Sequence, residues 1–296
     1  MNNTIRYICN DCPRQCSAIR GETGKGFCKM GLAPVVARAA LHFDEEPVIS
    51  GTKGSGTVFF GGCSLQCRFC QNYELSHNGF GKEITVKRLN EIYWELARKG
   101  ANNINLVNPT HFAEAILHSM EAGTPDIPFV WNTSGYERVE TLRRFVGRVQ
   151  IYLPDLKYIR PETAKRYSGA ANYFEYASKA LLEMQCQVGE AQFSDDGLMK
   201  SGMIVRHLIL PGCVEESKEI LTWIHENLPK AWVSVMAQYT PFGDVEGVDE
   251  LGRRITQEEY DEVMDHIDHL GIENGFVQEL EAASEKYIPL FDLTGV

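Results

Sequence analysis

From Thr57 onward the chain alternates short apolar runs with segments whose apolar residues recur at helical spacing. The runs are rich in β-branched and aromatic residues and stay apolar throughout, as strands do when both faces of a sheet are covered. They cover residues 57–60, 104–107, 128–131, 149–153, 203–210 and 232–237. This alternation is typical of βα units around a parallel sheet, so we predict an α/β fold.

The number of βα units limits how the sheet can close. Six βα units are too few to close an eight-stranded barrel, so we predict a partial, open (β/α)6 TIM-like barrel with its active site at the carboxyl ends of the strands. Thr85 and Gly100 bracket the first amphipathic segment as its N-cap and its stop. Thr256 and Glu259 form a capping box before the last one.

Composition narrows the class of protein. With 296 residues, 44% of them hydrophobic, the chain can bury a core without disulfides. Seven of the nine cysteines lie in the first 70 residues, which in a reducing compartment indicates metal ligation.

No run approaches the roughly 18 apolar residues of a membrane span, and the first six residues lack a signal-peptide pattern, so we expect a cytoplasmic protein with no membrane partner. A net charge of -11 argues against a nucleic-acid partner.

A three-cysteine loop follows the first predicted strand. Cys63, Cys67 and Cys70 have the spacing C-x3-C-x2-C and stand where a barrel places its active site. Three thiolates on a four-iron cluster leave one iron open for another ligand, as catalytic metal sites require. A structural zinc knuckle is the alternative, but zinc favours four ligands in paired C-x2-C units.

With Phe69 as its aromatic residue, this loop resembles the C-x3-C-x-aromatic-C signature of the radical SAM superfamily. Other motifs resemble the branch related to pyruvate formate-lyase activating enzymes, and within it the PflX-like group. They are residues 54–60, Gln71-Asn-Tyr73, Asn108-Pro-Thr-His111, Asn132-Thr-Ser134, Asp155-Leu-Lys157 and Met236-Ala-Gln-Tyr239.

The resemblance implies a mechanism. The open iron of a [4Fe–4S] cluster would bind the methionine moiety of S-adenosylmethionine (SAM) and pass it one electron. The resulting 5'-deoxyadenosyl radical would abstract hydrogen from a substrate, and a reductant such as flavodoxin or ferredoxin would supply the electron.

Polar residues at successive strand ends are the candidate cofactor ligands. They are Asn108, Thr110, Asn132, Ser134, Asp155, Lys157, Arg206 and Gln238. Asp155 and Lys157 resemble the Asp-x-Lys motif of activating enzymes. Asn108 and Thr110 stand where the family usually has Gly-Gly-Glu, so here the chain departs from the pattern. No catalytic residue is assigned.

Four more cysteines precede the barrel. Cys9, Cys12, Cys16 and Cys28 have the spacing C-x2-C-x3-C-x11-C, and four thiolates make a closed site suited to structure or electron transfer. The spacing resembles the cluster-binding segment of molybdopterin oxidoreductases, and a zinc knuckle stays open as the alternative. We predict a second metal centre here, a [4Fe–4S] cluster in preference to zinc. Residues 1–50 would form this Cys-rich segment and residues 51–296 the barrel.

These interpretations favour a radical SAM enzyme. By analogy with the family, we expect it to activate a partner protein, possible substrates being glycyl radical enzymes. A small-molecule or peptide substrate is an alternative within the same class. The alternative outside the enzymes is an electron-transfer protein with two metal centres. Such a protein would need no open iron.

Overall fold

The computed structural model describes residues 7–21, 25–280 and 289–296. Its centre is one sheet with the strand order β12-β11-β10-β8-β7-β6-β4-β3-β5, and β9 pairs with β10. The strands are β3 (Val35–His42), β4 (Ser55–Phe60), β5 (Lys82–Glu83), β6 (Ile104–Val107), β7 (Phe129–Thr133), β8 (Ile151–Pro154), β9 (Gln192–Phe193), β10 (Met199–Leu208), β11 (Trp232–Met236) and β12 (Gly275–Val277).

The six predicted runs form β4, β6, β7, β8, β10 and β11, and each of these strands runs parallel to its neighbours among the six. The predicted α/β fold with a mostly parallel sheet is therefore confirmed. The sheet stays open, because its order ends at β5 on one side and at β12 on the other. Three strands that the sequence did not reveal, β3, β5 and β9, pair antiparallel with their neighbours.

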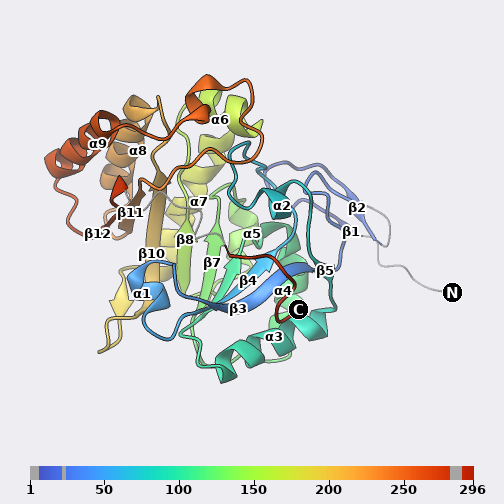
Figure 1. Ribbon diagram of the computed structural model, residues 1–296. Helices are drawn as coiled ribbons and strands as arrows, with labels where there is room; N and C mark the ends of the chain where they lie inside the picture. The colour runs from blue at the N-terminus through green and yellow to red at the C-terminus, as the bar shows by residue number, and fades with distance from the viewer. Residues whose placement is uncertain (1–6, 22–24, 281–288) are drawn as a thin grey trace.

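Helices cover the sheet, and Figure 1 shows α3 beside the β3 end and α8 and α9 beside the β12 end. They are α1 (Pro47–Ser50), α2 (Tyr73–Ser76), α3 (Val86–Arg98), α4 (Ala113–Glu121), α5 (Val139–Arg143), α6 (Pro161–Ser168), α7 (Tyr173–Val188), α8 (Val214–Asn227) and α9 (Gln257–Leu270), with short 3-10 turns at Thr110–Phe112 (η1) and Asp249–Gly252 (η2). The predicted caps are confirmed: Thr85 accepts a hydrogen bond from the Arg88 N–H, and Thr256 and Glu259 form the capping box of α9.

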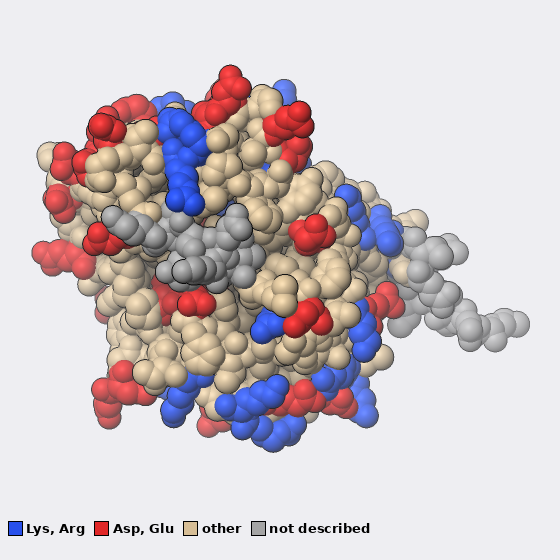
Figure 2. Space-filling view, viewed as in Figure 1, with Lys and Arg blue, Asp and Glu red and all other residues tan. Residues whose placement is uncertain are grey.

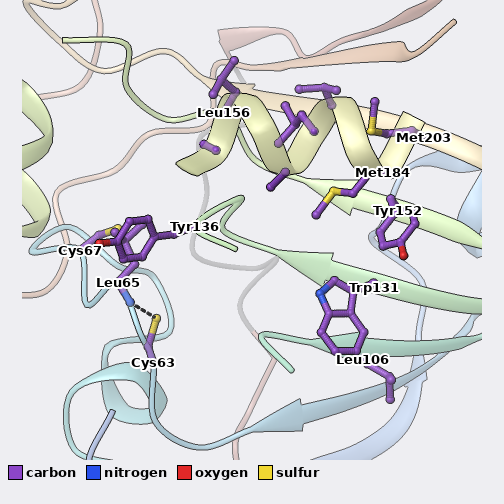
Figure 3. Packing of buried hydrophobic residues seen from close by; sticks show 14 of the residues in the cluster. Cys63, Leu65, Cys67, Leu106, Trp131, Tyr136, Tyr152, Leu156, Met184 and Met203 are labelled. Atoms are coloured by element: carbon purple, nitrogen blue, oxygen red, sulfur yellow. Dashed lines mark hydrogen bonds between the residues drawn. The ribbon is translucent and has the colours of Figure 1, made fainter. Parts of the chain in front are cut away.

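The sheet has one thickly covered face and one thin one. Trp131 belongs to the large core between the strands and the helices, whereas Val130, its neighbour in β7, packs with Ile49 of α1 in a smaller cluster on the opposite face. Figure 3 shows Met184 on the side of α7 that faces the strands, and Met184 and Tyr152 of β8 both belong to the large core. Side chains alternate along a strand, so residues two positions apart point to the same face. The polar residues that lie two positions after members of the smaller cluster therefore face the inside of the partial barrel.

The N-terminal region divides between two sheets. β1 (Tyr7–Ile8) and β2 (Ile19–Arg20) form a separate antiparallel pair. Residues 35–50, which the sequence groups with the Cys-rich segment, supply β3 and α1, and β3 pairs with β4 in the main sheet. The end of the chain also bonds to β3, because Ala39 N–H donates to Thr294 O over 2.8 Å.

No helix in the described part of the chain has the length and apolar character needed to cross a membrane. On the face shown in Figure 2, Lys and Arg are scattered among acidic residues rather than gathered in one basic patch.

Candidate active site

A cavity of about 250 Å³ opens at the carboxyl ends of the parallel strands. Cys63, Cys67 and Cys70, from the loop after β4, all line it. So do seven of the eight predicted cofactor ligands: Asn108, Asn132, Ser134, Asp155, Lys157, Arg206 and Gln238. They come from the ends of β6, β7, β8, β10 and β11, so strand order alone brings together residues that are far apart in the sequence.

The backbone of the cysteine loop is arranged around the first thiol. Leu65 N–H and Gln66 N–H point at Cys63 Sγ over 3.3 and 3.4 Å, and Figure 3 shows the first of these contacts. Gln66 has a φ of 54°, a left-handed conformation that residues other than glycine rarely adopt. Arg14 holds the loop from behind by donating to the Leu65 carbonyl over 3.1 Å.

The donor set fits a four-iron cluster. No group of three His, Cys, Asp or Glu side chains in the described residues is arranged as the ligands of one metal ion would be. Three thiols from one loop are the donor set of a four-iron cluster that leaves one iron open. Burial raises the pKa of Cys63 and raises that of Cys70 to about 12, so cluster binding must release protons from these thiols.

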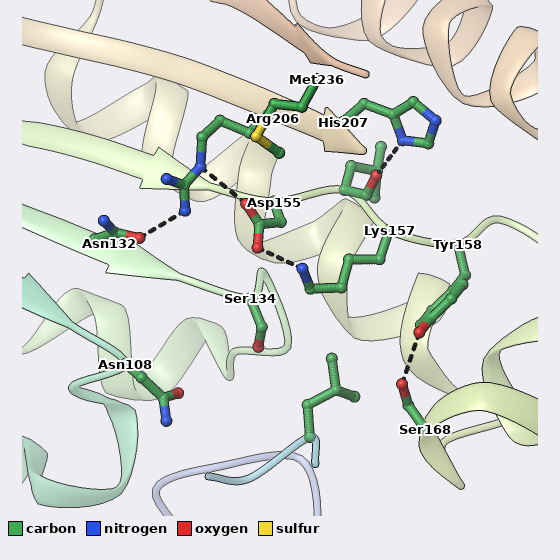
Figure 4. A network of polar contacts seen from close by, with 12 residues as sticks. Asn108, Asn132, Ser134, Asp155, Lys157, Tyr158, Ser168, Arg206, His207 and Met236 are labelled. Atoms are coloured by element: carbon green, nitrogen blue, oxygen red, sulfur yellow. Dashed lines mark hydrogen bonds and ion pairs between the residues drawn. The ribbon is translucent and has the colours of Figure 1, made fainter. Parts of the chain in front are cut away.

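A network of buried charges lines the same cavity as the thiols (Figure 4). Arg206 donates from Nε to Asp155 Oδ1 over 2.9 Å and from a terminal nitrogen to Asn132 Oδ1 over 2.6 Å. Lys157 Nζ donates to Asp155 Oδ2 over 2.6 Å. Burial opposes ionisation of Asp155, but Arg206 and Lys157 outweigh it and lower the pKa of this carboxyl. The carboxylate is therefore charged and clamped between two cations.

Glu45 is a cavity residue that the sequence analysis missed. It lies in the turn between β3 and α1, and its side chain is only 9% exposed. Its Oε1 accepts hydrogen bonds from Asn105 Nδ2 over 2.9 Å and from Asn132 Nδ2 over 3.2 Å, and its Oε2 lies 3.5 Å from Arg206. Burial raises the pKa of Glu45. The sequence signal that could have identified Glu45 was the acidic run at residues 44–46, directly before an apolar segment.

Thr110 does not line the cavity. It is 1% exposed, and its hydroxyl donates to Glu137 Oε1 over 2.5 Å. The same oxygen accepts from Thr133 and from Trp131, so this carboxyl ties the end of β6 to that of β7. His111 is fully buried, with Nε2 2.7 Å from the Gly61 carbonyl, and burial lowers its pKa to about 3, which keeps the ring neutral. These residues position the strand ends instead of meeting a ligand.

The four N-terminal cysteines lie outside the cavity. Cys9, Cys12 and Cys28 are buried, and Cys16 is exposed. The two groups of cysteines therefore belong to different places in the structure.

Comparison with known proteins places the chain in a family. The radical SAM superfamily model matches residues 57–185, a span that contains Cys63, Cys67 and Cys70. An uncharacterized protein of Methanocaldococcus jannaschii is 31% identical over 266 residues, which cover 87% of this chain and 73% of the relative.

Two solved structures have weaker similarity. SuiB of Streptococcus suis, bound to S-adenosylmethionine, aligns with 15% identity and a TM-score of 0.49 over 75% of this chain and 51% of SuiB, so the chain spans about half of that protein. Methylornithine synthase (PylB) aligns with 14% identity and a TM-score of 0.47 over 84% of this chain and 74% of its own. On the family match, residues 57–185 form a radical SAM superfamily domain, and the family implies an enzyme with a [4Fe–4S] cluster and SAM as its ligand.

Proposed function

We propose that the protein cleaves SAM reductively on a [4Fe–4S] cluster held by Cys63, Cys67 and Cys70, and uses the 5'-deoxyadenosyl radical to abstract hydrogen from a substrate. One observation carries the proposal: the three thiols and the network around Asp155 line the same cavity. When bound, the cluster supplies the electron that breaks the sulfonium.

The polar residues would hold SAM in place. Its methionine moiety carries one ammonium and one carboxylate group. Lys157 and Arg206 offer N–H donors to the carboxylate, and Asp155 and Glu45 attract the ammonium group. Because these side chains are already bonded to one another and largely buried, little order has to be created when the ligand binds.

For the substrate, we favour a partner protein activated at a backbone glycine. The Asp155-x-Lys157 pair and its resemblance to activating enzymes support this choice. A flavodoxin or ferredoxin would be the one-electron donor, and the cytoplasm the compartment. A small-molecule or peptide substrate is the alternative, and identifying the genes beside this one would discriminate between them.

Anaerobic reconstitution with iron and sulfide tests the proposal. With dithionite as reductant, the wild-type protein is expected to convert SAM to methionine and 5'-deoxyadenosine. Changing Cys63, Cys67 or Cys70 to Ala abolishes the reaction, because each removes one of three ligands. Cys186→Ala is the matched control, since Cys186 is exposed and lies outside the cavity.

Two outcomes would reject the proposed enzymatic function. Wild-type protein with full iron content that makes no 5'-deoxyadenosine would do so directly. An electron-transfer protein without an open iron would also give a reduced-cluster paramagnetic spectrum that SAM leaves unchanged, whereas the proposed enzyme predicts a changed spectrum.

A further inference from the structure

Two C-x3-C loops of this chain share an unusual backbone conformation. Residues 12–16 and residues 63–67 both place a glutamine directly before the second cysteine. Gln15 has a φ of 42° and Gln66 a φ of 54°, so both are left-handed. Steric repulsion makes this conformation rare for residues other than glycine. The N-terminal loop therefore shares a left-handed glutamine with the loop that would carry the family's cluster.

Backbone hydrogen bonds hold both loops close to their first cysteine. In the catalytic loop, the N–H of Leu65 points at the thiol of Cys63, two residues earlier. In the N-terminal loop, the N–H of Gln15 donates to the carbonyl of Cys12 over 3.1 Å. Backbone N–H groups aimed at sulfur stabilise thiolates and tune the potential of the clusters that they bind.

The other two N-terminal cysteines converge on this loop. The β1–β2 pair continues to Cys9, whose N–H donates to Ala18 O over 3.0 Å. A methyl group built on Gly26 would lie 3.4 Å from Cys16 Sγ and 3.5 Å from Cys28 Sγ, so these two sulfurs border the same small space. The lack of a side chain at Gly26 leaves that space open between them.

A buried cation points into the same place. Arg20 is 3% exposed, and one terminal nitrogen donates to Cys28 Sγ over 3.2 Å. The other terminal nitrogen donates to the carbonyls of His111 and Gly31, and Nε has no partner among the described residues. Among the described residues, none of the hydrogen bonds of this guanidinium is with a carboxylate. A guanidinium stays protonated, and burying it without a counter-charge is costly. Thiolates bound to a metal centre would supply that negative charge.

We propose that Cys9, Cys12, Cys16 and Cys28 bind a second [4Fe–4S] cluster, closed by four thiolates, with Arg20 as its buried counter-cation. The left-handed glutamine favours a cluster, because residues 63–67 share it and lie within the matched radical SAM domain. The proposal does not depend on the function proposed for the catalytic site.

The second centre would lie against the catalytic loop. A methyl group built on Gly62 would come within 2.6 Å of the Cys28 carbonyl, so the backbones of the two segments touch directly beside Cys63. Arg14 adds hydrogen bonds to the carbonyls of Ser64 and Leu65, over 2.9 and 3.1 Å. The two sites are adjacent, yet they share no ligand.

A variant without the catalytic ligands isolates the second site. With Cys63→Ala, Cys67→Ala and Cys70→Ala combined, the reconstituted protein is expected to keep about four irons and four sulfides per chain. Its reduced form should be paramagnetic and unaltered by SAM, since four thiolates leave no iron open. About one zinc per chain, or neither metal in a variant with wild-type circular dichroism, would overturn the proposal.

Substitution of one exposed cysteine tests the ligand set in the otherwise intact protein. Cys16→Ala removes an exposed thiol and leaves three, so it should change the paramagnetic spectrum of the reduced second cluster or release its four irons, while the SAM-sensitive signal of the catalytic cluster remains. Cys186→Ala, the exposed control, should leave the iron content unchanged. A Cys16 variant in which both the iron content and the spectrum of the second cluster are unchanged would exclude Cys16 as a ligand and with it the closed site.

Arg20 is tested through the reduction potential of the second cluster. In the triple Cys-to-Ala background, Arg20→Met is expected to move the midpoint to a more negative value, because a nearby positive charge favours the added electron. Arg20→Lys should restore most of the shift. An unchanged midpoint in Arg20→Met would remove its role as counter-cation. Wild-type protein that fails to cleave SAM would reject the proposed function alone and leave these measurements unaffected.

Discussion

Arg206 and Asp155 meet at the ends of two neighbouring strands, with Nε 2.9 Å from Oδ1. The backbone supports this contact, because Leu156 N–H donates to Arg206 O over 2.8 Å. The two side chains are 15% and 13% exposed, so they form a largely buried ion pair. The pairing of β8 and β10 therefore sets the charges of the cavity before any ligand arrives.

Breaking this pair should be costly. Arg206→Met leaves Asp155 buried with Lys157 as its remaining cation, so we expect the free energy of unfolding to fall by about 3 kcal/mol or more. Arg160→Met is the matched control, because Arg160 pairs with Glu219 at the surface and its loss should cost no more than about 1 kcal/mol. Anaerobic urea denaturation measures both. Equal losses would show that the buried pair contributes no more than a surface one.

The same network should determine SAM affinity. Asp155→Ala or Lys157→Ala removes a charged partner from the cavity, so SAM binding should weaken roughly 10- to 100-fold, the value of one charge-assisted hydrogen bond. Iron content should stay close to wild type, since neither residue is a cluster ligand. Anaerobic calorimetry gives the affinity, and Lys179→Ala, in an exposed pair with Glu175, is the control. Wild-type affinity in both cavity variants would remove the Asp-x-Lys pair from the binding site.

Glu137 should make stability depend on pH. Burial raises its pKa from 4.5 to about 7, so between these values the folded state keeps a proton that the unfolded state loses. Stability should therefore fall as pH rises through that window, by on the order of 3 kcal/mol relative to Glu137→Gln, which cannot ionise. Urea denaturation at several pH values measures the difference. Glu140→Gln, at an exposed ion pair, should show no such loss, and a constant difference between Glu137→Gln and wild type would contradict the prediction.

Gly62 should be indispensable to the contact between the two cysteine segments. Its φ is +77°, and a methyl group there would lie 2.5 Å from Met30 Cγ and 2.6 Å from Cys28 O. Gly147 has a similar φ of +74° but nothing within 4 Å, so Gly147→Ala reports the backbone strain alone. We expect Gly62→Ala to lose at least about 1 kcal/mol more stability than this control and to retain less iron. Equal free energies of unfolding and equal iron contents in the two variants would show that the two cysteine segments can move apart without loss of stability.

Much of the molecule could be predicted from local signals. Compact apolar runs identified the six central strands, because a strand covered on both faces needs apolar residues throughout. The capping residues Thr85 and Thr256 marked helix starts through hydrogen bonds that span three residues. Arg206 was predicted as a cofactor ligand at a strand end, and its side chain lines the cavity, because strand alternation fixes the direction of a side chain.

Other features were decided by the tertiary structure. Glu45 meets Arg206, 161 residues away, and Arg20 meets the carbonyl of His111, 91 residues away, so no local pattern marked either side chain as buried. Thr110 had the residue type and the strand-end position of a ligand, yet its hydroxyl is used by Glu137. Sequence spacing determines which residues stand at the ends of strands. Whether a polar group there faces a ligand or another polar group depends on which segments close over it, and long-range packing alone decides that.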